Sequence, residues 1–565
     1  MTAFLSKLVF GLAAAGALCL SAALADDPVA DLIIHNGKLV TVDGSFSIAE
    51  AAAIRDGRFI AVGGTGEVMA YRGADTRMID VGGRTVLPGF NDTHLHVLRR
   101  AVTFVEQVDL TEVQSIEDIQ AAIRARAEDV EPGEWIFGSR GWWEYELSDG
   151  RIPTRYDLDE AAPDNPVSIP GPHYDIVNSL ALELAGIDRN TPDPQGGEIR
   201  RDENGEPTGL LFDNASRPID AFFPEVPVER QLLGLKNMIA RINAYGITSY
   251  REPGGSLEGV ALLRRLYDAG ELNVRVDWAY NVDPNLPEDE LVAKLESFGP
   301  PGQTWGDGMF RADGLAEVGL DGAELTAMLR DPYPGRPDYT GLQKVPQDQF
   351  NLLALTAARM GWRLGPHAVG DAAIDEAIEA FRYANEHHPI QLERWMIDHA
   401  FLLIPDHYDD VRELGLFINS QYMHNAQLGA LILEAWERPL ADQSEMFGDW
   451  VENGIIFGNG ADGPVSYIAN PLLYIWGSVT RGTLWGGKLG PDQGLSREDA
   501  IRSVTIWSAY SSFEEKIKGS IEPGKYADFV VLSDPILEVP AEQIKDIEVL
   551  ATVLGGRTVH GSLAF

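Results

Sequence analysis

The sequence of 565 residues predicts an α/β fold: a (β/α)8 TIM barrel with a small β-sandwich module formed from both terminal regions and a long insertion after the first strand. Three observations indicate this fold. Short apolar segments alternate with helical stretches through the middle of the chain, turn-rich β segments lie near both ends, and one long irregular segment interrupts the alternation. A doubly wound open sheet is the structural alternative for the alternating part.

Residues 1–25 are predicted to be a secretory signal peptide. Lys7 precedes an apolar run, and the small residues Ala23 and Ala25 end this run directly before two aspartates. A transmembrane anchor is the weaker interpretation, because polar residues follow at once. Cleavage after Ala25 would remove Cys19, the only cysteine, and leave a chain without disulfides or a stable membrane anchor. We therefore expect a periplasmic or secreted protein.

Two segments that are distant in the sequence are predicted to share the β-sandwich. Residues 26–85 contain short apolar runs that are separated by Asn-Gly and Asp-Gly turns, and residues 511–565 show the same pattern with other glycine-containing turns. This pattern is typical of short strands joined by tight turns. The sandwich is therefore expected to have one part from each end of the chain.

The barrel is predicted to occupy residues 86–510. Its eight strands are expected at residues 86–97, 246–253, 272–280, 314–320, 362–370, 394–400, 416–424 and 454–462. Residues 99–241 separate the first strand from the second and are far longer than an ordinary βα loop. They are rich in aromatic and turn residues, so we expect an insertion with its own packing near the C-terminal mouth of the barrel.

The charge excludes some classes of partner. The chain has 86 acidic and 45 basic residues, for a formal net charge of −41. Such a field opposes binding to nucleic acid and to anionic lipid. Nucleic acid and anionic membranes are therefore not expected as partners; a small-molecule substrate is compatible with this charge, and a homodimer is a possible assembly.

Histidines and a carboxylate lie at the ends of several predicted strands. The segment "VLPGFNDTHLHV" places His94 and His96 one residue apart, so that both side chains can face one ion if the backbone is extended. Three further residues lie at corresponding strand ends: His367, His399 and Asp462. Barrel enzymes build their sites from the C-terminal ends of strands, and imidazole and carboxylate groups suit zinc and related divalent ions. A single histidine at such a position is more often structural than a ligand, but the set of them at corresponding strand ends predicts a metal site.

Glu317 is a further candidate ligand. It stands in "LAEVGL", where its neighbours are apolar, and a carboxylate that points into a barrel core is costly unless it is paired or bound to metal. A polar helix contact or a buried arginine is the structural alternative. As a ligand, Glu317 could bridge two cations.

The motifs "GFNDTHLH", "HAVGD", "DHA", "GADGPV" and "KGSIEPGKYADFVVL", in this order, resemble the amidohydrolase superfamily, and specifically its YtcJ-like branch, amidohydrolase family 3. The resemblance covers essentially the whole mature chain. It implies a divalent metal cofactor, with Zn²⁺ the expected ion and one or two ions per chain. By motif, His94, His96 and Asp462 would bind one ion and His367 with His399 a second. Glu317 would stand where relatives often carry a carboxylated lysine that bridges the ions.

The resemblance predicts a hydrolase of non-peptide C–N bonds, acting on an N-substituted amide or formamide through metal-activated hydroxide, and the predicted signal peptide adds that it is exported. Asp462 would be the catalytic residue that moves the proton from water to the leaving nitrogen. Lower-ranked candidates for contact with the amide-type substrate are His173, His424, Trp142 and Trp143. A lactone or ester hydrolase on the same site and a catalytically silent periplasmic binding protein are the alternatives.

One motif departs from the family pattern. Relatives tend to carry a His-Asp pair after the second strand, and Arg251 and Glu252 occupy these positions. The exchange could alter substrate recognition or replace one surface pair by another.

Overall fold

The computed structural model describes residues 29–565, except residues 112, 145–146, 172–173, 195–196, 465–466 and 485. The predicted signal peptide, residues 1–25, lies outside the described residues, as does Cys19. No helix within the described part of the chain is long and apolar enough to cross a membrane.

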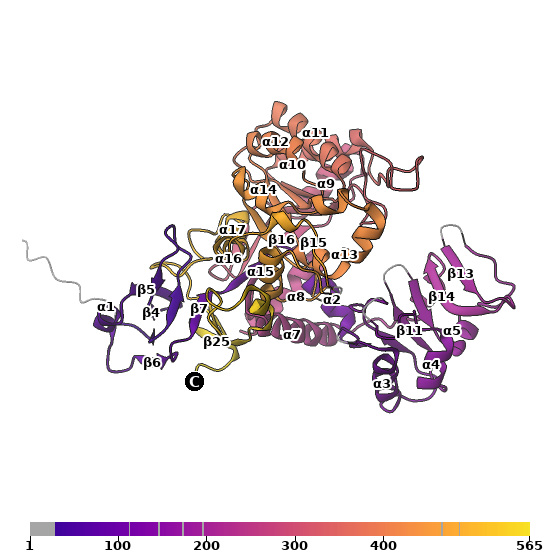
Figure 1. Cartoon of the computed structure of the whole chain (residues 1–565), viewed down its shortest axis with the longest axis horizontal. Helices are drawn as coiled ribbons and strands as arrows, with labels where there is room; N and C mark the ends of the chain where they lie inside the picture. The colour runs from indigo at the N-terminus through magenta and orange to yellow at the C-terminus, as the bar shows by residue number, and fades with distance from the viewer. Residues whose placement is uncertain are drawn as a thin grey trace, which may run out of the picture.

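Eight parallel strands form the barrel in the centre of the molecule (Figure 1). They are, in chain order and in the order of pairing, β8 (Phe90–Asp92), β15 (Ile247–Gly255), β16 (Arg275–Tyr280), β18 (Phe310–Gly319), β19 (Arg363–Ala368), β20 (Met396–His399), β21 (Phe417–Ser420) and β22 (Phe457–Asn459). The short β17 (Gln303–Trp305) pairs antiparallel with β18. The predicted (β/α)8 fold is thereby confirmed.

Backbone hydrogen bonds join the first and last strands where they end. The amide of His96 donates to the carbonyl of Gly463 at 2.8 Å, and the amide of Asp462 donates to the carbonyl of His94, also at 2.8 Å. The closure therefore lies within the two motifs that carry predicted ligands. Ring closure of a parallel sheet brings the C-terminal ends of all strands to one mouth.

Helices surround the barrel sheet (Figure 1). They are α2 (Val97–Phe104), α7 (Val228–Ala244), α8 (Leu257–Asp268), α9 (Glu288–Ser297), α10 (Gln347–Met360), α11 (Asp371–His387), α12 (Tyr408–Glu413), α13 (Tyr422–Trp436), α14 (Phe447–Glu452), α15 (Pro471–Thr480), α16 (Arg497–Ser503) and α17 (Ile506–Ser511). Single 3-10 turns lie at Pro405–His407, Leu440–Gln443 and Pro491–Gln493. Side-chain caps begin several of these helices; Ser256, for example, accepts from the amide of Gly259 at 3.2 Å.

Both ends of the chain build the β-sandwich. One sheet contains β1 (Leu32–His35), β4 (Ala51–Arg55), β5 (Arg58–Gly63) and β6 (Arg77–Asp80). The short helix α1 (Thr65–Val68) and a 3-10 turn at Met69–Tyr71 connect β5 to β6. The other combines β2 (Lys38–Val40), β3 (Ile48–Ala49) and β7 (Thr85–Pro88) with β23 (Phe529–Leu532), β24 (Val549–Leu554) and β25 (Arg557–Gly561), and a 3-10 turn covers Ala541–Asp546. Apolar side chains of both sheets share one buried core, as in a sandwich.

The insertion forms a separate lobe beside the barrel, opposite the sandwich (Figure 1). Its strands are β9 (Gln107–Val108), β10 (Ile136–Gly138), β11 (Val167–Pro170), β12 (Tyr174–Val177), β13 (Gly197–Arg201) and β14 (Pro207–Asp213), with helices α3 (Ile116–Ala127), α4 (Arg155–Ala161), α5 (Ser179–Leu184) and α6 (Arg217–Asp220). Its own apolar cores contain residues from Val108 to Phe223. The predicted range 99–241 also includes parts of α2 and α7, whose apolar residues pack in the barrel core.

The predicted seventh strand is too long. β21 ends at Ser420, and α13 begins at Tyr422, so His424 lies in the first turn of a helix instead of at a strand end. The side chain of Asn459 accepts from the amide of Tyr422 at 3.1 Å and so ties the beginning of this helix to the end of β22. An apolar run of this length does not by itself show where a strand gives way to a buried helix.

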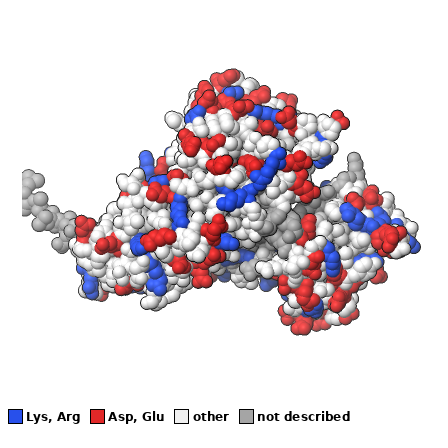
Figure 2. Space-filling model, viewed as in Figure 1, with Lys and Arg blue, Asp and Glu red and all other residues white. Residues whose placement is uncertain are grey.

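Acidic side chains are spread over the surface. Figure 2 shows them on the sandwich, the barrel and the insertion of the face in view, with basic side chains between them. On this face the acidic side chains therefore do not gather on one lobe.

Candidate metal centre

His94 and His96 lie directly after β8, at the C-terminal mouth of the barrel, where Leu95 pairs with Gly463 and closes the sheet. The carboxylate of Asp92 fixes this turn, because it accepts from the amide of His94 at 2.9 Å and from the hydroxyl of Tyr474 at 2.9 Å. The Nε2 atoms of His96 and His94 lie 3.0 and 3.8 Å from the same oxygen, Oδ1 of Asp462. The spacing of two residues therefore does bring both imidazoles to one point.

Glu317 lies near the end of β18, with its two carboxylate oxygens facing two pairs of histidines. Its Oε1 is 2.8 Å from Nδ1 of His367 and 2.5 Å from Nε2 of His399. Its Oε2 is 3.7 Å from Nε2 of His94 and 3.6 Å from Nε2 of His96. This is the arrangement expected of a carboxylate between two cation positions. Among the described residues the ion-pair partners of Glu317 are all histidines, so the alternative of a buried arginine paired with Glu317 is wrong.

Asp462 has a second neighbour, His424, which was predicted at the end of the seventh strand and comes instead from the first turn of α13. Its Oδ2 lies 3.3 Å from Nε2 of His424, and Nδ1 of His424 is buried with no hydrogen-bond partner in the described part of the chain. The rings of His424 and His399 have their centroids 5.6 Å apart. His424 therefore belongs to the cluster even though it comes from a helix.

The charges of the cluster shift several pKa values. Burial favours the neutral forms of Glu317 and Asp462, but hydrogen bonds and charges from neighbouring histidines hold the pKa of both carboxyls well below the usual value. Burial also opposes protonation of the histidines, yet adjacent carboxylates raise the pKa of His94 to about 10 and that of His367 to about 9. For His424 burial prevails and lowers the pKa to about 4. The carboxylates are therefore ionised at neutral pH, whereas His424 is neutral.

The donor set fits a divalent cation. Three overlapping groups of residues could each hold an ion, because the ligand atoms within each group lie within 4.8 Å of one another. The groups are His94, His96 and Asp462; His94, Glu317 and His399; and His399, His424 and Asp462. Nε2 of His94, which faces both carboxylates, is buried without a hydrogen-bond partner among the described residues. Among these residues, every ion pair of Glu317 and Asp462 is with a histidine. Imidazole nitrogen and carboxylate oxygen are the donors that Zn²⁺ takes in catalytic sites.

Further side chains orient the cluster, and sequence reasoning did not identify them. The side-chain oxygen of Gln421 lies 2.7 Å from Nδ1 of His399. Asp398 and Asn419 lie 3.8 and 3.3 Å from Nδ1 of His94. Carboxylate and amide groups behind a ligating histidine set its tautomer and ring orientation. The only sequence signal for Asp398 is its position directly before His399; Asn419 and Gln421 carried none.

The loop after β18 closes one side of the cluster. Asp321 accepts from the amides of Met328, Val369 and Gly370 at 2.9, 3.0 and 2.9 Å, and so fastens the loop to the end of β19. Glu324 is buried in the same loop, and its burial raises its pKa to about 7. The loop thus adds a carboxyl group that titrates near neutral pH, which the sequence analysis also missed.

The predicted substrate contacts have different positions. Trp142 is 2% exposed and packs in the core of the insertion. Trp143 reaches the barrel: its ring centroid lies 5.8 Å from that of Tyr467, whose ring is 4.5 Å from that of His424. His173 lies outside the described residues. One aromatic path therefore connects the insertion with the metal cluster.

Comparisons with known proteins agree with this geometry. N-substituted formamide deformylase from Arthrobacter pascens is 27% identical over 548 residues, which are 93% of this chain and 97% of that protein. Putative amidohydrolase YtcJ from Bacillus subtilis (strain 168) is 28% identical over 538 residues, 94% of this chain and 99% of that protein. The crystal structure of an uncharacterized metal-dependent hydrolase from Pyrococcus horikoshii OT3 superposes with a TM-score of 0.70 and 25% identity, covering 90% of this chain and 99% of the other.

A family model shows the relationship directly. The model of the amidohydrolase family matches residues 77–560, which include both carboxylates, all the histidines of the cluster and the sandwich strands β6, β7, β23, β24 and nearly all of β25. Together with the barrel, its histidines and its carboxylates, this match leads to one conclusion: the chain belongs to the amidohydrolase family and is a metal-dependent hydrolase of carbon–nitrogen bonds.

Proposed function

We propose that this enzyme hydrolyses an N-substituted amide or formamide with one or two Zn²⁺ ions held by His94, His96, Glu317, His367, His399 and Asp462. The observation that carries the proposal is the placement of Glu317, whose two oxygens face separate pairs of histidines. The similarity to an N-substituted formamide deformylase over nearly the whole chain supports the substrate class.

A divalent ion bound at these residues would polarise the substrate carbonyl and lower the pKa of a water molecule from about 15.7 towards 7. Asp462 has the position and charge of the proton carrier. It is ionised, and its Oδ1 and Oδ2 lie between His96 and His424. We expect its carboxylate to accept the proton of the attacking water and to deliver it to the leaving nitrogen.

His424 is suited to stabilise the negative charge that develops on the carbonyl oxygen of the substrate. Because its imidazole is neutral at pH 7, it can donate one hydrogen bond to the charge that develops on the carbonyl oxygen as the water attacks. The neighbouring Tyr467 and Trp143 extend the site towards the insertion and offer aromatic surface to the substituent on nitrogen.

The test combines metal analysis with a substrate panel. Purified enzyme is analysed by inductively coupled plasma mass spectrometry and assayed on N-substituted formamides, N-substituted acetamides and lactones, before and after dialysis against a chelator. We expect bound zinc and chelator-sensitive turnover of formamides or amides. Turnover of lactones alone would favour an ester hydrolase, and bound ion without turnover of any class would favour a silent binding protein.

We also propose that the enzyme is exported, with cleavage after Ala25. The support is the sequence pattern of residues 1–25 alone. Mass spectrometry of the periplasmic or secreted protein should find Asp26 at the N-terminus; an uncleaved chain in the cytosol would contradict export. The predicted homodimer stays a prediction that size-exclusion chromatography with light scattering can check.

A further inference from the structure

Arg251 and Glu252, which depart from the family pattern, are not a surface pair. They are consecutive residues of β15 and are 4% and 1% exposed. Because neighbouring side chains of a strand point to opposite faces, Arg251 enters the interior of the barrel and Glu252 turns towards the surrounding helices. The interpretation as an exchanged surface pair is therefore wrong.

Arg251 reaches the metal cluster through one intermediate residue. Its Nη1 donates to Oδ1 of Asp398 at 3.1 Å, and Asp398 is fully buried directly before the ligand His399. The same Oδ1 accepts from the side-chain amide of Asn419 at 2.6 Å and lies 3.8 Å from Nδ1 of His94. The guanidinium thus fixes and neutralises the carboxylate that stands behind His94.

A glycine of β19 leaves room for the ion pair between Arg251 and Asp398. A Cβ atom at Gly365 of β19 would lie 3.0 Å from both Nη2 of Arg251 and Oδ2 of Asp398. A larger residue at that position would require the pair to shift. The contact between Arg251 of β15 and Asp398 of β20 therefore depends on the missing side chain at Gly365 of β19.

Glu252 supports the other histidine of the motif from the opposite face of β15. Its Oε2 accepts from the amide of Leu98 at 2.9 Å, in the first turn of α2, and His96 is the N-cap residue directly before this helix. A carboxylate is well suited to the positive end of a helix. In addition, the amide of Leu95, between the two histidines, donates to the carbonyl of Arg251 at 2.9 Å.

We propose that Arg251 and Glu252 are positioning residues of the metal centre: Arg251 holds His94 through Asp398, and Glu252 holds His96 through the first turn of α2. The inference rests on the proposed metal site. A carboxylate at Nδ1 leaves Nε2 of His94 directed at the ion, and the ion pair with Arg251 keeps that carboxylate in place. The departure from the family pattern is then a different way of supporting the same ligands.

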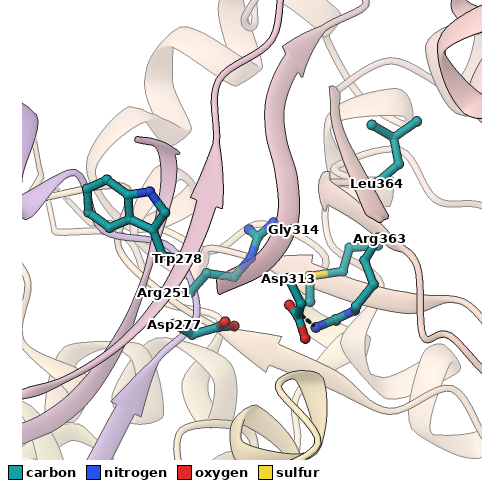
Figure 3. A pocket seen from close by; sticks show the side chains of 8 residues that line it. Arg251, Asp277, Trp278, Asp313, Gly314, Arg363 and Leu364 are labelled. Atoms are coloured by element: carbon teal, nitrogen blue, oxygen red, sulfur yellow. Dashed lines mark hydrogen bonds and ion pairs between the residues drawn. The ribbon is translucent and has the colours of Figure 1, made fainter. Parts of the chain in front are cut away.

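The barrel contains a matched control for Arg251. Arg363 donates to Asp313 at 3.0 Å, and these side chains are 5% and 6% exposed, against 5% and 0% for Arg251 and Asp398. Figure 3 shows Arg251 and Arg363 around one internal cavity, with the contact between Arg363 and Asp313 drawn. Neither residue of this second pair has a histidine of the cluster among its hydrogen-bond or ion-pair partners within the described residues.

The first experiment compares Arg251→Met with Arg363→Met. The affinity for Zn²⁺ is measured by competition with a chromogenic chelator, and the visible absorption of the Co²⁺-loaded protein reports ligand geometry. We expect Arg251→Met to bind Zn²⁺ about 10–100-fold more weakly, the usual effect of removing an outer-shell partner, and to change the Co²⁺ spectrum. Arg363→Met should keep the affinity and spectrum of the native enzyme, even if it unfolds at lower temperature.

The second experiment uses the two carboxylate positions. Asp398→Asn keeps the shape but removes the charge, and we expect it to weaken Zn²⁺ binding as Arg251→Met does. Glu252→Gln retains an oxygen that can accept from the amide of Leu98, so its affinity should stay closer to native than that of Glu252→Ala. This rescue by the conservative variant separates positioning from general packing.

Equal affinities and spectra in Arg251→Met and Arg363→Met would overturn the inference, as would equal affinities in Glu252→Gln and Glu252→Ala. If Arg251→Met does not fold, the comparison is made between Arg251→Lys and Arg363→Lys, and a Co²⁺ spectrum altered in neither would have the same meaning. The proposed metal site fails separately, if the native enzyme binds Zn²⁺ no better than His94→Ala.

Discussion

The two ends of the barrel interior both hold buried charges, but they compensate these charges differently. At the floor, carboxylates pair with guanidinium groups: Asp313 with Arg363 at 3.0 Å, and Asp528 with Arg275 at 2.7 Å. At the mouth, the ion pairs of Glu317 and Asp462 within the described residues are all with histidines.

This difference explains which end of the barrel performs chemistry. A guanidinium stays charged at every physiological pH, so it compensates a carboxylate permanently. An imidazole can lose its proton and offer the same electron pair to a metal ion. The ion pairs of the floor are therefore permanent, whereas the mouth can exchange protons for a cation. Asp398 joins the two, because it contacts both Arg251 and His94.

The largest expected effect is at the mouth, from His94→Ala. Removing this imidazole takes a donor from two of the three ligand groups. We expect loss of bound metal and a fall in kcat/KM of more than about 100-fold, since losing only an outer-shell partner costs 10–100-fold. His35→Ala and His560→Ala, in β1 and β25 of the sandwich, are the controls and should retain both metal and activity. Full metal content in His94→Ala would show that the ion lies elsewhere.

A smaller effect is expected from Glu317→Gln, which keeps the shape of the side chain but removes its charge. If Glu317 bridges two ions, this variant should lose at least one ion per chain and most of its activity. The native enzyme should not respond to added bicarbonate, because a glutamate needs no carbon dioxide to present a carboxylate. Unchanged metal stoichiometry and turnover in Glu317→Gln would assign the residue a structural role.

A substitution at the floor should lower the free energy of unfolding without changing the metal content of the protein. Arg275→Met leaves Asp528 buried and unpaired between the barrel and the sandwich; both side chains are about 5% exposed. Breaking a buried pair costs about 3–5 kcal/mol, so the urea midpoint should fall markedly while bound zinc stays the same. Arg200→Met, which removes an exposed pair with Glu198, is the control and should leave the unfolding curve in place. Loss of zinc from Arg275→Met would remove the distinction between the two ends.

The last and smallest effect concerns pH. In the ion-free protein the pKa of His94 is raised to about 10, so this group is protonated at neutral pH and must release its proton to bind metal. We expect Zn²⁺ affinity to rise by up to about tenfold per pH unit for each proton displaced, and to weaken as pH falls. The ion-free protein should show the opposite trend, because a raised pKa adds stability below about 6.5 that is lost as pH rises through 10. Isothermal titration calorimetry in buffers of different ionisation enthalpy counts the protons; no proton release at pH 7 would contradict this assignment.

Much of the fold follows from patterns that neighbouring residues carry. Alternation of short apolar strands with helices predicts the barrel, and glycine-rich turns at both ends predict the shared sandwich. The strand-end positions of His94, His96, His367, His399 and Asp462 predict a common site, because parallel strands present their C-terminal ends at one mouth. Even Glu317 could be identified locally, as a charged residue in an apolar strand.

Only the tertiary structure decides which distant residues meet. Arg251 and Asp398 are 147 positions apart and contact each other because β15, β19 and β20 are wound into one barrel. The change from β21 to a buried helix places His424 beside Asp462, and the packing of the insertion, not its aromatic content, decides that Trp142 lies in a core while Trp143 faces Tyr467. Periodicity and turn chemistry depend on a few neighbouring residues and are therefore visible in the sequence, whereas these contacts depend on register and closure of the whole sheet, which no local pattern encodes.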